Sequence, residues 1–217
     1  MKEYKGYKLY FEDEQKEKIL KDIINKNFHI EREYKNDNRT YVAKIIIDNK
    51  SFILKKFYIN KKIKKILSIF KTGESIRTFK NIQVFAKKIP ELVKIYGAGI
   101  KRKGIFIKEE FILMEYIEGK IIDKDEFYLK ILEILIKIHK ENRYHGDCNP
   151  GNFIFDKVGH IYVLDTKVKK MLFGNYRAHY DILTLFKYFK NKPEYPYKKN
   201  IFYNIAFLMR KYRSQKK

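Results

Sequence analysis

The feature that most constrains this chain is a polar loop placed between an apolar helical pattern and two short apolar runs. Apolar residues recur at helical spacing before the loop, at Phe127, Ile131, Ile134, Leu135 and Ile138. This spacing predicts a helix that ends near Asn142. The polar loop covers residues 144–151, and residues 153–155 and 161–164 then predict two strands. A helix, a loop and a hairpin in this order hold the loop's polar side chains at a fixed place.

The first half of the chain is dominated by strand patterns. Residues 7–11 alternate, and residues 41–47 and 51–57 are rich in β-branched and aromatic side chains around the turn 48–50, which predicts a hairpin. Three glycines at 97, 99 and 104 favour a turn-rich stretch, followed by strands over 105–107 and 110–116.

Helical spacing marks the other segments. Residues 61–88 predict two helices, or one helix broken at Thr72 and Gly73, and residues 181–188 and 201–208 predict two more. The chain therefore has a β-rich part followed by a mainly helical part, with a junction near Glu118 and Gly119.

Composition indicates a globular protein. Hydrophobic residues make up 45% of the 217 residues, and no apolar run approaches the roughly 18 residues of a membrane-spanning helix. The N-terminus has no apolar segment like that of a signal peptide. Cys148 is the single cysteine, which excludes an internal disulfide and is typical of a reducing compartment. We therefore expect a cytoplasmic protein.

The net charge of +23 leaves several interpretations open. It fits binding to nucleic acid, to an anionic membrane face or to an acidic substrate. It also fits a solvated Lys-rich surface in an organism whose codon usage favours Lys, Asn, Ile and Tyr. The Lys residues are scattered and carry no RNP-like or zinc-finger signature, so we expect no nucleic-acid partner.

The loop and the second short strand carry the candidate chemistry. Asp147 and Asn152 lie five residues apart, and Asp165 follows 13 residues later at the end of the strand pattern. Phosphoryl transfer needs a carboxylate beside the attacking hydroxyl and oxygen ligands for Mg²⁺. Any one of these residues alone is more simply a turn or cap residue. The set at these spacings favours phosphoryl transfer.

Residues 145–152 read H-G-D-C-N-P-G-N, which resembles the H-G-D-x-x-x-x-N form of the protein-kinase-like superfamily. The resemblance implies an ATP- and Mg²⁺-dependent enzyme with Asp147 as catalytic base and Asn152 and Asp165 as metal ligands. His145 and Asp181 would be structural, and Gly151 would allow close backbone packing. Thr166 and Lys167 replace the Phe-Gly that usually follows the second Asp.

The implied fold class is α+β, a two-lobed kinase-like domain over residues 1–217. Residues 1–117 would form a β-rich N-lobe and the hinge, and residues 118–217 a mainly helical C-lobe.

The same resemblance suggests the nucleotide side of the site. Residues 51–55, S-F-I-L-K, resemble the V-A-I-K strand and nominate Lys55, with Lys56 on the other face. Glu74 would pair with Lys55 from the next helix, although a first-turn Glu also simply favours the helix dipole. Residues 111–119 resemble the hinge, where adenine would meet Met114 and the backbone of Glu115 and Ile117.

A glycine-rich phosphate loop is missing. No glycine occurs between Tyr7 and Phe70, so a different loop would cover the phosphates. We place this loop at residues 34–39, where Lys35 and Arg39 could contribute.

The stretch from Asp165 to Asp181 is short and lacks A-P-E, which favours a small hydroxyl acceptor over a polypeptide. Together with G-D-x-x-x-G-N-F-I at residues 146–154 and Y-x-E-G at 116–119, the whole chain resembles the lipopolysaccharide core heptose(II) kinases. The resemblance implies transfer of the ATP γ-phosphate to a sugar hydroxyl, a heptose above all, of the inner core. The partner would be the core oligosaccharide of nascent lipopolysaccharide, at the inner face of the cytoplasmic membrane.

The basic tail over residues 201–217 could contact that anionic leaflet peripherally, or it could be an ordinary helix with a solvated end. No obligate protein partner is indicated. Two other functions stay open. One is a compact atypical Ser/Thr protein kinase or another small-molecule kinase, and the other is an inactive pseudokinase that only binds.

Overall fold

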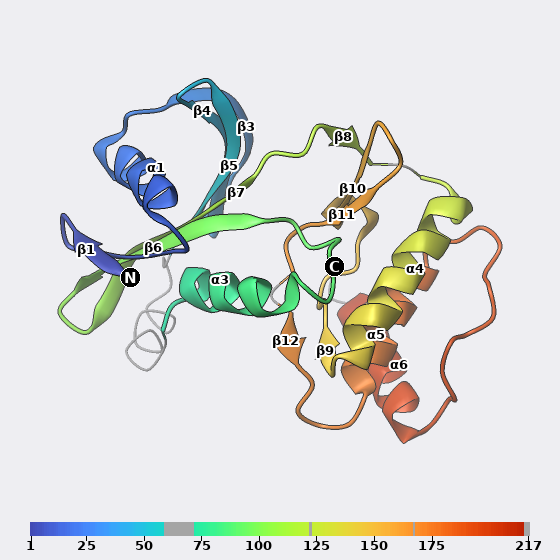
Figure 1. Ribbon diagram of the computed structural model, residues 1–217. Coiled ribbons are helices and arrows are strands. Elements are labelled where there is room, and N and C mark those ends of the chain that lie inside the picture. The colour runs from blue at the N-terminus through green and yellow to red at the C-terminus, as the bar shows by residue number, and fades with distance from the viewer. Residues whose placement is uncertain (59–71, 122, 167, 215–217) are drawn as a thin grey trace. The chain divides into compact units, whose positions relative to one another are not determined.

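The computed structural model describes residues 1–58, 72–121, 123–166 and 168–214. The chain forms two units, which are described separately. Unit 1 comprises Met1–Val84 and Val93–Tyr116, and unit 2 comprises Phe85–Leu92 and Ile117–Lys217. The described residues contain a large antiparallel sheet in unit 1 and five α-helices in all, a mixed architecture that is consistent with a kinase-like fold (Figure 1).

Unit 1 is built on a seven-stranded sheet in the order β1-β2-β6-β7-β5-β4-β3. Every neighbouring pair is antiparallel. The strands are β1 (Lys2–Tyr4), β2 (Tyr7–Phe11), β3 (His29–Asn36), β4 (Thr40–Ile47), β5 (Lys50–Phe57), β6 (Ile95–Lys103) and β7 (Phe106–Glu115). The predicted strand at residues 7–11 and the predicted hairpin of β4 and β5 are confirmed. Asp48 and Asn49 both adopt positive φ in its turn, as a tight hairpin requires.

Helix α1 (Glu14–Asn25) covers one face of this sheet and was not predicted. It begins after Asp13, whose side chain accepts a hydrogen bond from the Lys16 amide at 2.9 Å, an N-cap of the usual kind. Leu20 and Ile23 of the helix are buried against apolar residues of four strands, Leu9, Ala43, Ile45, Phe52, Leu54 and Leu113. This core fixes one face of β5, so the residues that alternate with Phe52 and Leu54 point to the other face.

Helix α3 (Glu74–Phe85) contacts the opposite face of the sheet at its first turn. Glu110 of β7 is buried there and accepts hydrogen bonds from the backbone N–H and the hydroxyl of Ser75, both at 3.0 Å. Helix α3 confirms the second half of the helical pattern predicted over residues 61–88. Residues 59–71, and with them the first half of that pattern, lie outside the described residues.

The prediction of a turn-rich stretch at the three glycines was wrong for two of them. Gly97 and Gly99 lie inside β6, and β7 is one continuous strand rather than two. A Cβ at Gly97 would come within 2.6 Å of the Leu20 side chain, and one at Gly99 would collide with the Phe111 ring. These glycines therefore let neighbouring side chains pack closely over the strand, and Gly104 alone lies in the turn.

Unit 2 is mainly helical. Its helices are α4 (Asp125–Lys140), α5 (Tyr176–Phe186), α6 (Ile201–Ser214) and the short 3-10 turn η1 (Pro150–Asn152). Its strands are short: β8 (Gly119–Lys120), β9 (Arg143–Tyr144), β10 (Phe153–Asp156), β11 (Ile161–Val163) and β12 (Lys169–Lys170). Strand β10 pairs with β8 and β11, and β9 pairs with β12. The predicted helix before the loop, the two strands after it and the two C-terminal helices are confirmed. The helices α5 and α6 are longer than predicted.

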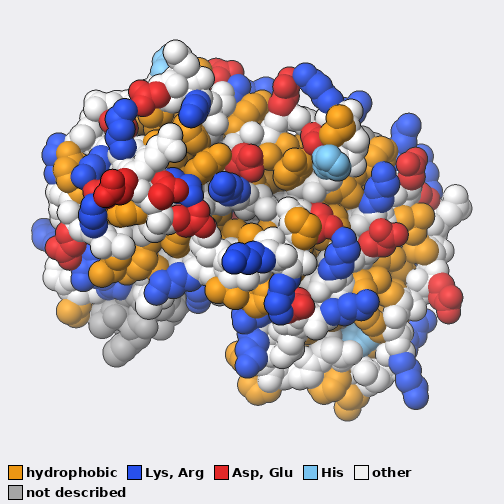
Figure 2. All heavy atoms as spheres, viewed as in Figure 1, with side chains coloured by type: hydrophobic (Ala, Val, Ile, Leu, Met, Phe, Trp, Pro, Cys, Tyr) orange, Lys and Arg blue, Asp and Glu red, His pale blue; other side chains and the backbone are white. Residues whose placement is uncertain are grey.

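Basic side chains are spread over the surface. In Figure 2 the Lys and Arg side chains are separated by polar, acidic and hydrophobic groups, and no large continuous basic area appears on the face in view. None of the described helices is both long enough and apolar enough to cross a bilayer.

Candidate active site

The predicted catalytic loop is held by a buried carboxylate of helix α5. Asp181 is 1% exposed, and it accepts hydrogen bonds from the backbone N–H groups of His145 at 2.7 Å and Gly146 at 3.0 Å. His139 of α4 contacts the same carboxylate through Nε2 at 3.3 Å. The structural role predicted for Asp181 is thus confirmed. Gly146 has φ +92°, which explains the glycine before Asp147.

The buried His145 ring supports the loop through a hydrogen bond to the loop backbone. Its Nδ1 accepts a hydrogen bond from the backbone N–H of Asp147 at 3.2 Å. Burial lowers the pKa of His145, although the nearby carboxylates of Asp181, Asp147 and Asp165 oppose that shift. A neutral ring whose Nδ1 carries no proton agrees with the lowered pKa and with the hydrogen bond that Nδ1 accepts. His145 is therefore a structural residue, as predicted.

The Asp147 side chain is exposed and is oriented by a relay of two further residues. Asn149 donates a short hydrogen bond from Nδ2 to the Asp147 carboxylate. The Tyr188 hydroxyl, just beyond α5, donates to Asn149 Oδ1 at 2.7 Å. Because Oδ1 is occupied by Tyr188, the Asn149 amide is locked with its NH₂ group toward Asp147. The relay therefore fixes the direction of the predicted base.

Asn152 connects Asp147 with the strand that precedes Asp165. Its Nδ2 donates to the backbone carbonyl of Asp147 at 2.7 Å. Its own backbone carbonyl accepts from the Leu164 amide, also at 2.7 Å, which ties the loop to the end of β11. With Nδ2 donating to Asp147, the Asn152 side chain has Oδ1 left to accept from a donor or to bind a cation. This orientation suits the metal-ligand role predicted for Asn152.

Asp165 lies directly after this connection, in the link from β11 to β12. Its φ is +47° and its side chain is exposed. The next residue, Thr166, is buried, and its hydroxyl lies 3.5 Å from the His145 carbonyl and accepts from the Val168 amide at 3.2 Å. The link thus runs back beside the catalytic loop. Lys167, which replaces the usual glycine, lies outside the described residues.

Among the described residues, no group of three His, Cys, Asp or Glu side chains is placed to hold a metal ion. The loop instead offers one amide oxygen from Asn152 and carboxylates from Asp165 and Asp147. Mg²⁺ is commonly held by one or two protein oxygens together with substrate phosphates and water, so this donor set fits that ion.

Two loop residues do not take part in the candidate chemistry. Cys148 is 1% exposed, and burial raises the pKa of its thiol, so it is no candidate nucleophile. The close packing predicted at Gly151 is not observed, because a Cβ there would make an ordinary 3.9 Å contact with Ile121.

The predicted nucleotide residues of unit 1 lie on the α3 side of the sheet. Lys55 is 9% exposed and pairs with Ile112 of β7, so it shares a sheet face with Ile112 and Glu110. Glu110 binds the first turn of α3, which Glu74 begins. Lys56 points to the other face, where its Nζ lies 5.6 Å from the centre of the Tyr41 ring. The pairing of Lys55 with Glu74 stays a prediction.

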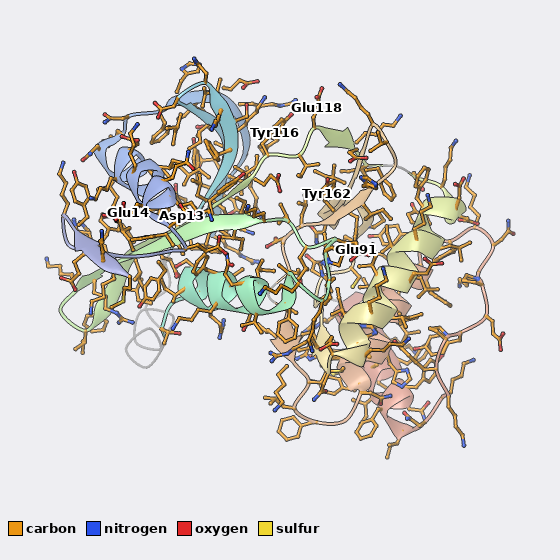
Figure 3. All side chains as sticks on the ribbon, viewed as in Figure 1. Asp13, Glu14, Glu91, Tyr116, Glu118 and Tyr162 are labelled. Atoms are coloured by element: carbon orange, nitrogen blue, oxygen red, sulfur yellow. The ribbon has the colours of Figure 1, made fainter. Side chains whose placement is uncertain are left out.

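The predicted adenine contacts lie at the end of β7 and just after it. Met114 and Glu115 are the last two residues of β7, and Ile117 follows between Tyr116 and Glu118, which Figure 3 labels. The Glu115 amide donates to the Lys94 carbonyl at 2.9 Å. The Glu115 amide is therefore occupied and does not offer a donor to a ring nitrogen of a nucleotide, whereas a nucleotide amino group, itself a donor, would need the Glu115 carbonyl. The contacts of these residues with adenine stay a prediction.

The segment proposed to cover the phosphates is a tight hairpin. It comprises the end of β3 and the turn into β4, and the Asp37 carboxylate accepts from the backbone amides of Arg39 and Thr40, both at 2.8 Å. These bonds lower the pKa of Asp37 to about 2. Lys35 lies 3.2 Å from Asp37. An Asp-centred turn thus stands where a glycine-rich loop is usual.

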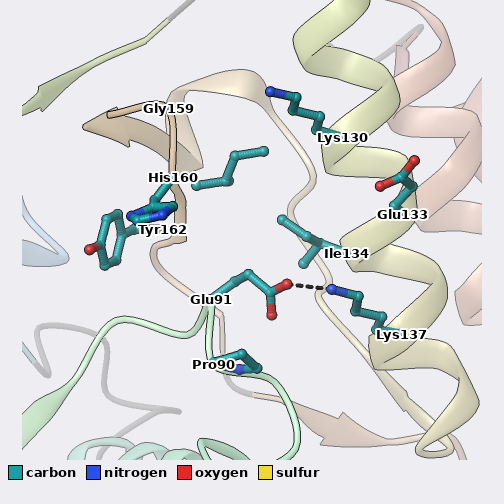
Figure 4. Close-up of a pocket in the computed structure, with 10 residues that line it drawn as sticks. Pro90, Glu91, Lys130, Glu133, Ile134, Lys137, Gly159, His160 and Tyr162 are labelled. Atoms are coloured by element: carbon teal, nitrogen blue, oxygen red, sulfur yellow. Dashed lines mark hydrogen bonds and ion pairs between the residues drawn. The ribbon is translucent and has the colours of Figure 1, made fainter. Parts of the chain in front are cut away.

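Unit 2 also contains a pocket of about 490 Å³ between α4 and the β10–β11 hairpin (Figure 4). Glu91 reaches one wall and forms an ion pair with Lys137 at 2.6 Å, while Lys130, His160 and Tyr162 line the others. None of the predicted site residues lines this pocket. It is therefore separate from the candidate catalytic loop.

Three residues that support candidate site segments were missed by the sequence analysis, namely Asn149, Tyr188 and Glu110. Asn149 lies inside the loop motif, but its link to Tyr188 spans 39 residues and has no local signal. Glu110 lies in an alternating strand, where an acidic residue ordinarily indicates the solvent face. Because Lys108 and Glu109 directly precede it, no local signal marks Glu110 as buried.

No family model matches the chain. Over 121 residues, or 52% of the chain, it is 31% identical to a probable bifunctional tRNA threonylcarbamoyladenosine biosynthesis protein of Methanocaldococcus jannaschii, of which the match covers 22%. Over 49 residues, or 22% of the chain, it is 37% identical to the probable serine/threonine-protein kinase ndrC of Dictyostelium discoideum, of which the match covers 4%. The chain thus spans less than a quarter of the length of either relative. These distant similarities support a kinase-like protein and a general kinase function, and neither relative is named as a lipopolysaccharide kinase.

Proposed function

We propose that the protein is an ATP- and Mg²⁺-dependent phosphotransferase whose catalytic base is Asp147. The observation that carries this proposal is the position of Asn152, hydrogen-bonded to the Asp147 carbonyl on one side and to Leu164, the neighbour of Asp165, on the other. One rigid connection thus relates the candidate base and both candidate metal ligands.

In the proposed reaction, the acceptor hydroxyl approaches the exposed Asp147 carboxylate. Its proton passes to that carboxylate as its oxygen bonds to the γ-phosphorus, and the bond to ADP breaks. Mg²⁺, when bound, would neutralise the phosphate charge. Asn152 and Asp165 would orient the phosphates through it, and Asn149 would hold the base toward the hydroxyl. By the resemblance, Lys55 would contribute positive charge to phosphate binding.

The test is transfer of labelled phosphate from ATP to an acceptor in the presence of Mg²⁺. Asp147→Ala should abolish transfer, because loss of a general base costs about 10²- to 10⁴-fold in rate. Glu194→Gln is the matched control, since Glu194 is also an exposed acid of unit 2. Equal transfer by wild type and Asp147→Ala would contradict the assignment of the base.

We propose that the acceptor is a sugar hydroxyl of the lipopolysaccharide inner core, and that this sugar is a heptose. This finer proposal rests on the resemblance of residues 116–119 and 146–154 and on the short link from Asp165 to Asp181. The basic composition suits an acidic glycolipid. Purified core glycolipid should become labelled on a sugar phosphate ester, and label on protein alone would refute this acceptor.

The Methanocaldococcus relative suggests a second candidate function, because its name describes a protein of tRNA threonylcarbamoyladenosine biosynthesis. The net charge of +23 is compatible with a reaction that takes place on or beside tRNA. Stimulation of ATP turnover by tRNA, without labelling of glycolipid, would favour this function. Labelled Ser or Thr in added proteins would favour the protein kinase named in the second comparison.

A further inference from the structure

Helix α6 of unit 2 has an apolar face that the described part of the protein leaves uncovered. Ile201, Ile205 and Leu208 are spaced by four and three residues and therefore lie on one side of the helix. They are 68%, 39% and 64% exposed. The opposite side is packed, because Ala206 is fully buried and Arg213 donates to the Tyr180 hydroxyl of α5 at 3.1 Å. The helix is therefore docked on α5 with its apolar face outward.

A neighbouring loop extends this apolar face. Leu172 and Phe173, between β12 and α5, are each 74% exposed. Gly174 follows with φ +53°, and a Cβ there would collide with the ring of Phe202 in the first turn of α6. The loop therefore lies against the start of α6. We call Leu172, Phe173, Ile201, Ile205 and Leu208 the α6 patch. In Figure 2, hydrophobic side chains reach the surface at the lower edge, where Figure 1 places α5 and α6.

The two chain segments that carry the α6 patch have charges of one sign. Residues 166–180 and 195–214 contain no Asp or Glu, although the whole chain has 26. The same two segments contain nine Lys and Arg residues, namely Lys167, Lys169, Lys170, Arg177, Lys198, Lys199, Arg210, Lys211 and Arg213. Exposed Leu, Ile and Phe side chains on segments whose charged residues are all basic form the pattern of a helix that lies in a membrane interface.

We propose that the α6 patch docks unit 2 onto an anionic lipid surface. The Leu172–Phe173 loop and the outer face of α6 enter the boundary between headgroups and acyl chains, and the surrounding basic residues contact anionic headgroups. Nucleic acid fits this surface less well. Its phosphates would attract the basic residues, but they would make no favourable contact with three exposed aliphatic side chains on one helix face. The proposal is independent of the phosphotransfer reaction, since lipid binding needs no nucleotide.

The experiment is sedimentation of the full chain with vesicles, in the absence of ATP. Vesicles of phosphatidylcholine alone are compared with vesicles that also contain phosphatidylglycerol. We expect binding to the anionic vesicles, and weaker binding as salt is raised because the headgroup contacts are screened. Leu172→Ser with Phe173→Ser, and separately Ile205→Ser with Leu208→Ser, should each lower the partition constant at least about tenfold.

Two control variants keep the test specific. Val158→Ser and Ile105→Ser remove apolar side chains that are 76% and 58% exposed elsewhere, and they should leave binding unchanged. Lys170→Gln with Lys198→Gln should lower binding to anionic vesicles by about fivefold for each charge removed. Lys157→Gln with Lys190→Gln, which removes two exposed charges away from the patch, should change it much less. Unfolding curves of all variants show whether each remains folded.

Several results would overturn the proposal. One is the absence of binding to anionic vesicles, and another is binding that both patch variants retain. A concentration-dependent dimer in analytical ultracentrifugation that the patch variants abolish would instead mean that a second copy covers the patch. Binding to tRNA that the same variants abolish would assign the surface to nucleic acid.

Discussion

Both units of the protein use a buried carboxylate to anchor a segment that carries predicted site residues, but the two carboxylates are held by different sets of partners. In unit 2, Asp181 accepts from two backbone amides of the catalytic loop and contacts His139. In unit 1, Glu110 accepts two hydrogen bonds from Ser75 at the start of α3, and the backbone N–H of Glu74 contributes a further one. Burial raises the pKa of Glu110 above its ordinary value of 4.5 in spite of these bonds. The loop of unit 2 is thus held by three residues through Asp181, and we expect the attachment of α3 in unit 1 to respond to protonation of Glu110.

The largest effect is expected from removing the anchor of unit 2. Asp181→Ala leaves the buried amide of His145 and the partly buried amide of Gly146 without their acceptor, which should lower the free energy of unfolding by about 3 kcal/mol. The loop should also lose its shape, so transfer should fall by more than about a hundredfold even where the variant is folded. Urea unfolding and the labelled-phosphate assay measure the two effects. A stable and active variant would show that Asp181 does not hold the loop.

The next effect concerns the two neighbouring lysines of β5. Lys55→Met should lower kcat/KM for ATP by about a hundredfold, because a positive charge beside the phosphates is lost. Lys56→Met is the matched control, since Lys56 is one residue away on the opposite face of the sheet. Its kcat/KM should change less than about threefold. Equal losses in the two variants would mean that unit 1 contributes overall charge and not a specific contact.

Removing the relay of Asn149 and Tyr188 should have a smaller effect, and this effect should be confined to the chemical step. Asn149→Ala should lower kcat roughly tenfold, and Tyr188→Phe less, because the Asp147 carboxylate loses its fixed direction. The KM for ATP should be unchanged in both variants. Steady-state kinetics separate the two parameters, and Tyr180→Phe, which removes another hydroxyl of the α5 region, is the control. A change in KM with kcat intact would place the relay in nucleotide binding.

The smallest effect is a pH dependence at Glu110. Because its pKa is higher in the folded than in the unfolded state, Glu110 contributes stability at low pH and loses it as pH rises above about 4.5 through the folded pKa. The stability of wild type relative to Glu110→Gln should therefore fall with rising pH. Thermal unfolding of both proteins between about pH 4 and 8 tests this. A difference that does not vary with pH would mean that Glu110 titrates as it does in the unfolded chain.

The sequence predicted unit 2 better than unit 1, and the reason is the range of the interactions. The candidate catalytic loop is framed by a helix and a hairpin that are adjacent in sequence, so the spacing of Asp147, Asn152 and Asp165 could predict that they lie on one connected segment. The contact of Asn149 with Tyr188 joins residues 39 apart and left no local pattern. The packing of α5 brings such pairs together, and the periodicity of the sequence does not predict that packing.

In unit 1 the errors have a similar origin. Gly97 and Gly99 were interpreted as turn residues, yet they serve a strand that must pass close to Leu20 and Phe111. Helix α1 is a different case, because Ile19, Leu20, Ile23 and Ile24 recur at helical spacing and the sequence analysis overlooked them. Strand β3 has no such pattern, since every one of its residues is exposed. Edge strands show less periodicity because few of their residues are buried.

The central claim is that Asp147 is the base of a phosphotransferase, and the most direct measurement is the kinetics of Asp147→Asn. This change keeps the size of the side chain and removes its negative charge. We predict that kcat falls by at least about a hundredfold while the KM for ATP changes less than about threefold, because the side chain acts on the acceptor and not on the nucleotide. A folded Asp147→Asn variant with kcat within about threefold of wild type would contradict the account.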